Sequence, residues 1–339
     1  MVLINLFDKG KGLEYLKNVY HLSDQEVNKV KESLYEYCEP EQMSEESADA
    51  IMESMFSWLS DEEKQSTKEG IMAPVLPHWQ VVDFPVEKFL EITHVKLDDS
   101  PLSDLRFYCI HVSPAIDGGE SIKQKGLRKL TDLLEVKSPI KSFLAEYGIE
   151  VSPSERWYSI HGKKYSITGT ELEIKLFYTN SEIEAFIAGD YENLKDYSCI
   201  ESNPEFLREL SPLCGIDLQT EWEKRKNALL YVSFDVSFDE CSNITEMSEI
   251  QCQERYQSLL PFLNQSYEYG KEPISIWRNY WFIYACIKNS CPDSRVARSP
   301  MAVKESVVLD SRRIKTWTIN HVISNISKRS AKSRTLWSE

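Results

Sequence analysis

The first hundred residues carry the spacing of amphipathic helices. In "HLSDQEVNKVKESLYEYC", residues 21–38, Ser23 and Glu26 stand three positions apart, which is the spacing of a capping box at a helix start. Apolar side chains then recur at helical intervals. Residues 44–60 repeat this style, and the two prolines of "MAPVLPHWQ" interrupt it. The pattern therefore predicts a mostly helical region over residues 1–100.

Beyond residue 104 the pattern changes to short apolar runs. Alternation typical of a half-buried strand is strictest in "NALLYVSFDVSFDE", where every second side chain is apolar. A Gly-Lys pair in "RWYSIHGKKYSITG" predicts a hairpin. The aromatic segment "IWRNYWFIYACIK" is too short to cross a membrane and is predicted to be core. Strands are predicted at 105–112, 172–179, 227–240 and 305–310, and helices at 118–134, with a break at Gly126, and at 181–189.

These elements predict an α+β protein in three parts. An acidic helical region covers residues 1–100, a domain that combines strands with helices covers 101–325, and a basic tail covers 326–339. The chain has 339 residues, of which 42% are hydrophobic and 27% charged, which is an ordinary globular composition.

The composition excludes several classes of protein. No apolar run is long enough for a membrane span, and the N-terminus lacks the order of a signal peptide, so we expect a cytoplasmic protein without membrane contact. Eight cysteines are scattered without a C-x-x-C pair or a histidine at zinc spacing. This distribution predicts reduced core thiols and no metal site.

Charge is unevenly distributed along the chain. The formal net charge is −15, with a strong acidic excess in residues 1–100 and a basic excess in 311–339. A chain this acidic does not attract nucleic acid non-specifically as a whole. The basic C-terminal segment can contact RNA or DNA, dock on the acidic region, or remain a solvated tail, and all three interpretations stay open.

Three segments carry candidate chemistry. In "CIHVSPAIDGGESIKQKGLRKL", His111 ends a predicted strand, Ser113 follows, and the next helix closes on Gly126-Leu127. In "KESVVLDSRRIKTW", Glu305 stands directly before an apolar run. Between them, "IKLFYTNSEIEAFIAG" joins a predicted strand bearing aromatic rings to a predicted helix. Each segment alone is also compatible with a structural role, as a hydrogen-bonded histidine, core aromatic rings or the solvated start of a strand.

The order of these segments resembles the ADP-ribosyltransferase fold superfamily, in the branch of diphtheria toxin and poly(ADP-ribose) polymerase. The resemblance covers roughly residues 105–320 and implies a split β-sheet core with NAD as the co-substrate. It implies that Glu305 stabilises the oxocarbenium-like state formed when the bond between nicotinamide and ribose breaks. His111 would hydrogen-bond a ribose hydroxyl, and Ser113 would support the same sugar. The aromatic face for nicotinamide would come from Phe177, with Tyr178 as runner-up, and a second face from Phe186 or Tyr191.

The chain departs from the family pattern at several positions. The glycine of the family's His-Gly-Thr is Val112 here, and Lys175 and Phe177 replace the Gly-x-Tyr of the middle motif. Val303, two positions before the glutamate, is neither Gln nor Glu, which disfavours arginine as the acceptor. Lys304 could hold a phosphate or a nucleic-acid backbone. These changes favour transfer of a single unit over chain building, and they leave open a catalytically inactive relative of the family.

The resemblance implies a mono-ADP-ribosyltransferase acting as a toxin or antiphage-defence effector on a macromolecule. A nucleic-acid acceptor is favoured over a protein because of the basic tail and Lys304. The acidic helices of residues 1–100 would receive an antitoxin or another regulator. The alternative hypothesis is a non-catalytic α+β interaction protein whose N-terminal helices bind a protein partner. The enzyme hypothesis requires His111 and Glu305 to face one cleft.

Overall fold

The chain forms two compact units, each discontinuous in sequence. Unit 1 comprises Met1–Phe7, Leu102–Glu246 and Arg298–Glu339, and unit 2 comprises Asp8–Pro101 and Met247–Ala297. The segment 247–297, which the sequence analysis places in the second region, thus groups with the N-terminal helices. The computed structural model describes residues 2–36, 86–99, 101–179, 182–189, 204–243, 255–268, 270–290, 299–304 and 306–318.

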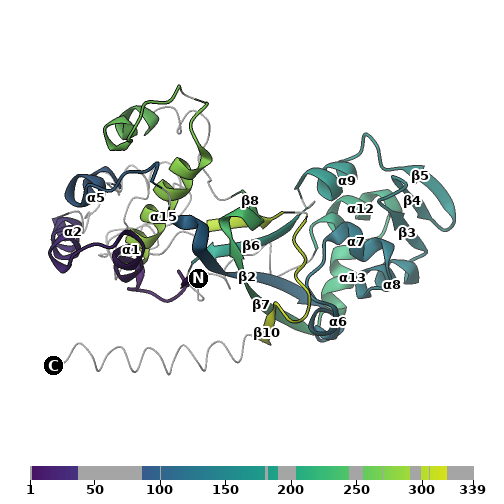
Figure 1. Cartoon of the computed structure of the whole chain (residues 1–339). Coiled ribbons are helices and arrows are strands. Elements are labelled where there is room, and N and C mark those ends of the chain that lie inside the picture. Colours follow the sequence, from purple (N-terminus) through teal and green to yellow (C-terminus); the bar gives the residue numbers. More distant parts are fainter. Residues whose placement is uncertain are drawn as a thin grey trace, which may run out of the picture. The chain divides into compact units, whose positions relative to one another are not determined.

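A seven-stranded sheet forms the first part of unit 1 (Figure 1). Its central pair is β2 (Leu105–Ala115) and β7 (Ala228–Ser237), which run antiparallel along their whole length. The strand order is β10-β7-β2-β6-β9-β8, and β1 pairs in parallel with the start of β2. The remaining strands are β1 (Val2–Ile4), β6 (Ile183–Ala188), β8 (Cys241–Asn243), β9 (Ser299–Val303) and β10 (Lys315–Thr318).

The predicted strands at 105–112 and 227–240 are confirmed as β2 and β7. β7 was predicted to bury only one of its two faces, but in the structure both faces are buried. Tyr231 and Ser233, on the face opposite Val232, are 1% and 2% exposed. Since β7 lies between β2 and β10 and both of its faces are covered here, it is an inner strand of the core.

The second part of unit 1, which we call the helical lobe, comprises residues 120–179 and 204–225. Its helices surround a small three-stranded sheet and share one apolar core that includes Phe143, Leu172 and Leu210. The predicted hairpin is confirmed, with a turn at His161-Gly162, where both φ angles are positive. The elements are α6 (Glu120–Lys125), α7 (Leu130–Glu135), α8 (Pro139–Glu146), β3 (Ile149–Ser152), β4 (Trp157–Ile160), β5 (Lys163–Ser166), α9 (Glu171–Ile174), a π-helical turn (Lys175–Thr179), α12 (Phe206–Cys214) and α13 (Leu218–Arg225).

Unit 2 is helical over its described residues, as predicted for the N-terminal region. The capping box is confirmed, because the amide of Ser23 donates to Glu26 Oε2 (2.7 Å) and the amide of Glu26 donates to Ser23 Oγ (3.2 Å). The predicted core segment 276–288 lies in a largely buried helix, α15. Residues 44–60 lie outside the described residues. The helices are α1 (Gly12–Tyr20), α2 (Asp24–Glu36), α5 (Val86–Thr93) and α15 (Ile274–Ser290).

Two neighbouring predictions in the middle segment are wrong, because the helix and the strand are exchanged. Residues 172–179 are helical and not a strand: Thr170 caps them by accepting from the amide of Glu173, and Leu172 and Leu176 share a buried helical face. Residues 183–188 form β6 and not a helix, because the strand pairs with β9, and Ala185, Phe186 and Ile187 are buried in succession, as in a strand covered on both faces.

The predicted final strand at 305–310 is also wrong over its described residues. They form an irregular segment with one isolated bridge, at Leu309. Val308 is 72% exposed, so the apolar run does not bury the face that a core strand needs. The sheet uses the residues on either side of the run instead, in β9 and β10.

Candidate functional site

A cavity of about 350 Å³ lies in unit 1 between the end of β2, the start of β6 and the helical lobe. Three of the predicted site residues line it, namely His111, Ser113 and Phe186. β2 and β6 pair only where Ile110 faces Phe186. After Ile110, β2 remains paired with β7 on one side, but within the described residues it has no strand partner on its other side. The cavity lies along this unpaired edge of β2.

His111 bridges the two strands where they separate. Its Nδ1 lies 2.7 Å from the carbonyl oxygen of Glu184 on β6. A carbonyl can only accept, so Nδ1 carries the hydrogen and Nε2 is left as an acceptor. Burial lowers the pKa of His111, since it disfavours the charged ring, although the bond to the Glu184 carbonyl acts in the opposite direction. His111 is therefore a neutral imidazole that can accept a hydrogen bond from a ligand hydroxyl.

The Gly126-Leu127 pair holds the segment that follows Glu305. The amide of Leu127 donates to the carbonyl oxygen of Leu309 across 2.9 Å. Gly126 has a φ of +83°, and a Cβ at this position would lie 2.0 Å from the Leu309 carbonyl oxygen. Only glycine permits both this backbone conformation and this close approach. Gly126 and Leu127 both line the cavity, so the crossing forms part of its wall.

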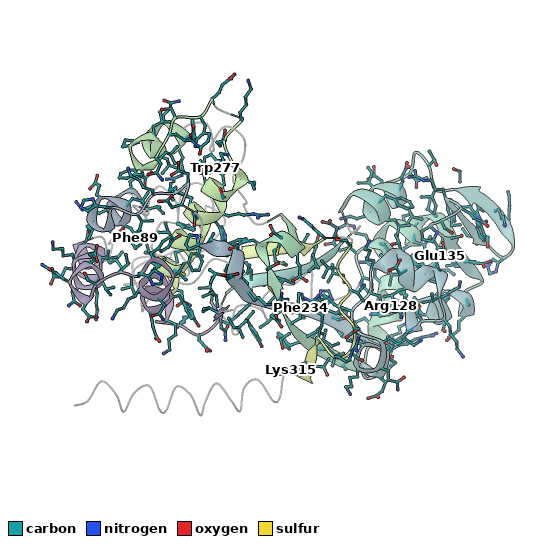
Figure 2. All side chains as sticks on the ribbon, viewed as in Figure 1. Phe89, Arg128, Glu135, Phe234, Trp277 and Lys315 are labelled. Atoms are coloured by element: carbon teal, nitrogen blue, oxygen red, sulfur yellow. The ribbon has the colours of Figure 1, made fainter. Side chains whose placement is uncertain are left out.

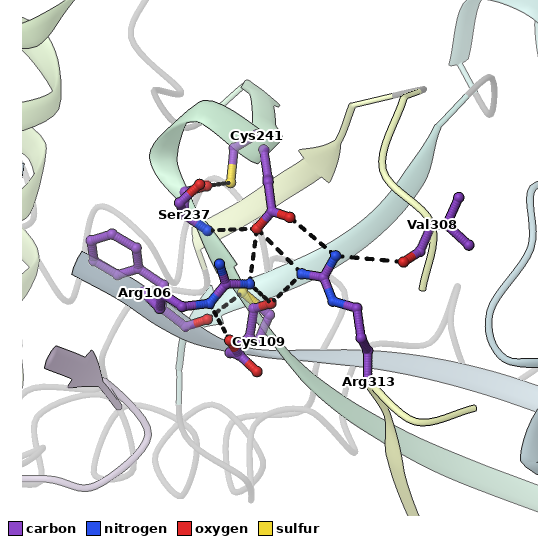
Figure 3. Close-up of polar contacts among 9 residues, drawn as sticks. Arg106, Cys109, Ser237, Cys241, Val308 and Arg313 are labelled. Carbon is purple, nitrogen blue, oxygen red and sulfur yellow. Dashed lines mark hydrogen bonds and ion pairs between the residues drawn. The ribbon is translucent and has the colours of Figure 1, made fainter. Parts of the chain in front are cut away.

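An ion-pair network anchors the same segment to the central strands (Figure 3). Arg313 Nη1 lies 3.0 Å from Glu240 Oε1, and Arg313 Nη2 donates to the carbonyl oxygen of Asp235 at 2.9 Å. Arg106 on β2 reaches both Glu240 and Asp235. Burial would raise the pKa of Glu240, but hydrogen bonds from Arg313 and the Ser237 amide, with the charges of the two arginines, lower it. Glu240 is therefore an ionised carboxylate that both guanidinium groups share.

Glu305 itself lies outside the described residues, but the chain on both sides of it is held at the cavity. Val303 pairs with Ile183 on β6, and Leu309 bridges Leu127. Both partners, Ile183 and Leu127, line the cavity. The amide of Lys304 also donates to the Glu240 carbonyl at 2.8 Å.

The predicted aromatic positions divide between two places. Phe186 lines the cavity, but Phe177 packs on the core of the helical lobe, with the Arg156 guanidinium 4.7 Å from its ring centroid, and it does not line the cavity. The physical reason is the helical turn at 175–179, which replaces the predicted strand. The side chain of Tyr178 and all of Tyr191 lie outside the described residues.

Sequence reasoning missed a pair of carboxylates at the cavity. Glu184 on β6 and Glu205, directly before α12, both line it. Glu205 Oε2 forms an ion pair with Lys175 Nζ at 2.6 Å. Burial and the neighbouring charge of Glu205 raise the pKa of Glu184, and Lys175 partly offsets this. The signal that could have revealed Glu184 is a single carboxylate within the otherwise apolar run of β6, two positions before Phe186.

A cationic edge was also missed. Lys125, Arg128 and Lys137 come from α6 and from the connections around α7, and all three line the cavity. The Leu127–Leu309 crossing fixes the backbone directly before Arg128. No sequence motif marks these side chains, because the helices that carry them come together only in the folded lobe.

Comparisons with protein-family models, curated proteins and solved structures found no match to this chain. Within the described residues, no three histidine, cysteine, aspartate or glutamate side chains gather as metal ligands. None of the described cysteines forms a disulfide with another described residue, and Cys109, Cys241 and Cys286 are buried. None of the helices in the described ranges has the length and apolar character needed to cross a bilayer.

Proposed function

We propose that this cavity binds NAD and that the protein transfers the ADP-ribosyl group of NAD to a macromolecule. The observation that carries the proposal is the convergence of separate segments on one cavity. His111 and Ser113 line it, and the chain on both sides of Glu305 is bonded to cavity-lining residues. Catalytic groups that act on one sugar need this common location.

The proposed reaction breaks the bond between nicotinamide and C1′ of the ribose. The bonding electrons leave with nicotinamide, and the ribose passes through an oxocarbenium-like state. The carboxylate of Glu305 stabilises that positive charge. Nε2 of His111 accepts a hydrogen bond from a hydroxyl of the same ribose. An acceptor oxygen or nitrogen then bonds to C1′ and loses its proton, so that the products are free nicotinamide, the modified acceptor and one proton.

We further propose a nucleic-acid acceptor, because the segment 311–339 is basic in an otherwise acidic chain. A role as a toxin or defence effector follows from the resemblance described above. The acidic helices of unit 2 would then bind a regulator, such as an antitoxin. A protein acceptor is the alternative, and the assay below distinguishes the two.

The test is release of nicotinamide from NAD by the purified full chain, alone and with RNA, single-stranded DNA or cell lysate. Glu305→Gln should lower the rate by about a hundredfold or more, because it removes the charge that stabilises the transition state. His111→Ala should lower it by about tenfold, the effect of one hydrogen bond to a bound ligand.

Two matched controls accompany these variants. His161→Asn changes an exposed histidine in the β4–β5 turn, and Asn tolerates its positive φ. Glu223→Gln changes an exposed carboxylate on α13. Both should leave nicotinamide release unchanged. A folded protein that neither releases nicotinamide nor binds NAD would overturn the proposal and favour the interaction-protein hypothesis.

A further inference from the structure

The lining of the cavity combines cationic and acidic side chains that come from different elements. Arg128 and Lys137 lie on the helical-lobe wall, where both side chains are exposed; Figure 2 labels Arg128. Within the ranges that the structure describes, neither forms an ion pair. Glu135, two positions before Lys137, is occupied elsewhere, because it accepts hydrogen bonds from the amide and hydroxyl of Ser154 at 2.8 and 2.7 Å. The positive charge of this wall is therefore available to an anion.

β6 contributes a carboxylate to the lining of the cavity. Glu184 lies on β6, and its side chain forms no ion pair or hydrogen bond with other described residues, whereas Glu205, which also lines the cavity, is paired with Lys175. The backbone carbonyl of Glu184 accepts the His111 hydrogen bond, so both residues lie where β6 meets β2. His111 and Glu184 therefore belong to the same edge of the cavity.

An unsatisfied donor lies at an apolar part of the cavity wall. Trp222 on α13 lines the cavity and is 3% exposed, and its indole Nε1–H has no hydrogen-bond partner among the described residues. Leu133 and Ile140 line the cavity with it. Buried donors in folded proteins are nearly always paired, so an orphaned one at a cavity wall points to an acceptor supplied by a ligand.

We infer that the cavity binds its dinucleotide in a single direction, with the pyrophosphate at Arg128 and Lys137 and the nicotinamide at Glu184. This inference rests on the proposed function and adds the orientation of the substrate. The oxidised nicotinamide ring is a cation and is attracted to the Glu184 carboxylate. The pyrophosphate is an anion and is attracted to Arg128 and Lys137. Adenine is a flat ring whose nitrogens accept hydrogen bonds, which suits the apolar part of the wall and the Trp222 N–H.

The orientation predicts a preference between two forms of the ligand. NADH differs from NAD in the ring charge, because its dihydronicotinamide is neutral. Attraction to Glu184 therefore strengthens binding of NAD and not of NADH. We expect the full chain to bind NAD about twofold to fivefold more tightly than NADH, the range for one partly screened charge pair.

The experiment measures dissociation constants by calorimetry for the full chain and its variants, with NAD, NADH and ADP-ribose for every protein and with AMP and nicotinamide mononucleotide in addition for the Trp222 variant. Glu184→Gln should abolish the preference for NAD over NADH, while the matched control Glu120→Gln, on α6 and outside the cavity wall, should retain it. Arg128→Gln and Lys137→Gln should weaken all three ligands alike and reduce the dependence of binding on salt. Trp222→Phe should weaken ADP-ribose and AMP but leave nicotinamide mononucleotide unchanged.

Each result bears on either the orientation or the activity. Equal binding of NAD and NADH by the unmodified chain, or a preference that survives Glu184→Gln, would overturn the orientation, even where nicotinamide release is intact. Absence of binding by both dinucleotides would overturn the proposed function and the orientation together. Thermal unfolding of each variant separates lost binding from lost folding. For Trp222→Phe, the result is taken from the ratio of its affinity for AMP to its affinity for nicotinamide mononucleotide.

Discussion

The amide of Leu127 donates a hydrogen bond to the carbonyl oxygen of Leu309 and so joins the α6–α7 connection to the segment that follows Glu305. These two segments are far apart in sequence, and each carries part of one candidate site. The bond is possible because the preceding residue, Gly126, has no side chain to keep the two backbones apart. The predictions below concern this crossing, the ion pairs beside it and the two titratable groups of the cavity.

Gly126→Ala should destabilise the protein strongly. The φ of +83° costs about 1–3 kcal/mol for a residue with a Cβ, and the contact with the Leu309 carbonyl adds about 1–3 kcal/mol. Gly169→Ala is the matched control, because Gly169 has a φ of +80° with no atom within 4 Å of an added Cβ. Urea unfolding of both variants measures the difference. Equal losses would show that the close approach to Leu309 contributes nothing.

Arg313→Gln should cost about 1.5–3 kcal/mol, because it removes charge-assisted hydrogen bonds to Glu240 and the Asp235 carbonyl in a half-buried setting. The neighbouring Arg312→Gln should change stability by less than about 0.5 kcal/mol, since Arg312 is 88% exposed and pairs only with Asp310. Denaturant unfolding and nicotinamide release should both separate the two variants. Similar effects of both substitutions would mean that the network does not hold this segment in place.

His111 should make stability fall in mild acid. Its pKa is about 6.5 in an unfolded chain, and burial lowers it in the folded protein. The unfolded state therefore binds more protons as the pH falls below about 6.5, and folded-state stability is lost down to the lower folded pKa. Each unit between the two pKa values is equivalent to about 1.4 kcal/mol. Unfolding of the unmodified chain and His111→Gln between pH 8 and pH 5 should diverge below pH 6.5, and parallel curves would contradict the prediction.

Glu184→Gln should stabilise the protein at neutral pH while impairing the site. Burial and the charge of Glu205 raise the pKa of Glu184, so the folded state holds a proton that the unfolded chain releases near pH 4.5. Stability is therefore lost as the pH rises from about 4.5 through the folded pKa, and the amide avoids this loss. Solvent screening limits the gain to about 0.5 kcal/mol. Melting temperatures at pH 5 and pH 7.5 check this, with a larger gain expected at the higher pH.

The sequence was most informative where local and tertiary preferences agree. β2 and β7 have long apolar runs and lie at the centre of the sheet, and the Ser23–Glu26 box forms from two side chains in one turn of chain. The candidate residues His111 and Ser113 were predictable because they lie towards the end of the apolar run that forms β2, and strand ends are common places for polar site residues.

The exchanged elements show where sequence reasoning failed. The aromatic run before Thr179 favours a strand by composition, but Thr170 and Glu173 supply a helix cap that outweighs it. Residues 183–188 are apolar except for Glu184, and a short apolar run does not distinguish a strand from a buried helix by its periodicity alone. The opposing charges of Glu184 and Arg128 had no sequence signature, because they face one cavity only through tertiary packing.

The division of unit 1 among three stretches of sequence has a consequence for the order of synthesis. β9 and β10 are translated after every other strand of this sheet, yet β9 lies between β6 and β8, and β10 covers an edge of β7. A nascent chain that has reached residue 298 contains His111 but neither of these strands nor the Arg313 anchor. Pairings this distant in sequence are also slow to form. The cavity can therefore close only after these strands have left the ribosome, and any activity of that cavity would begin later than the synthesis of His111 by at least the time needed to add them.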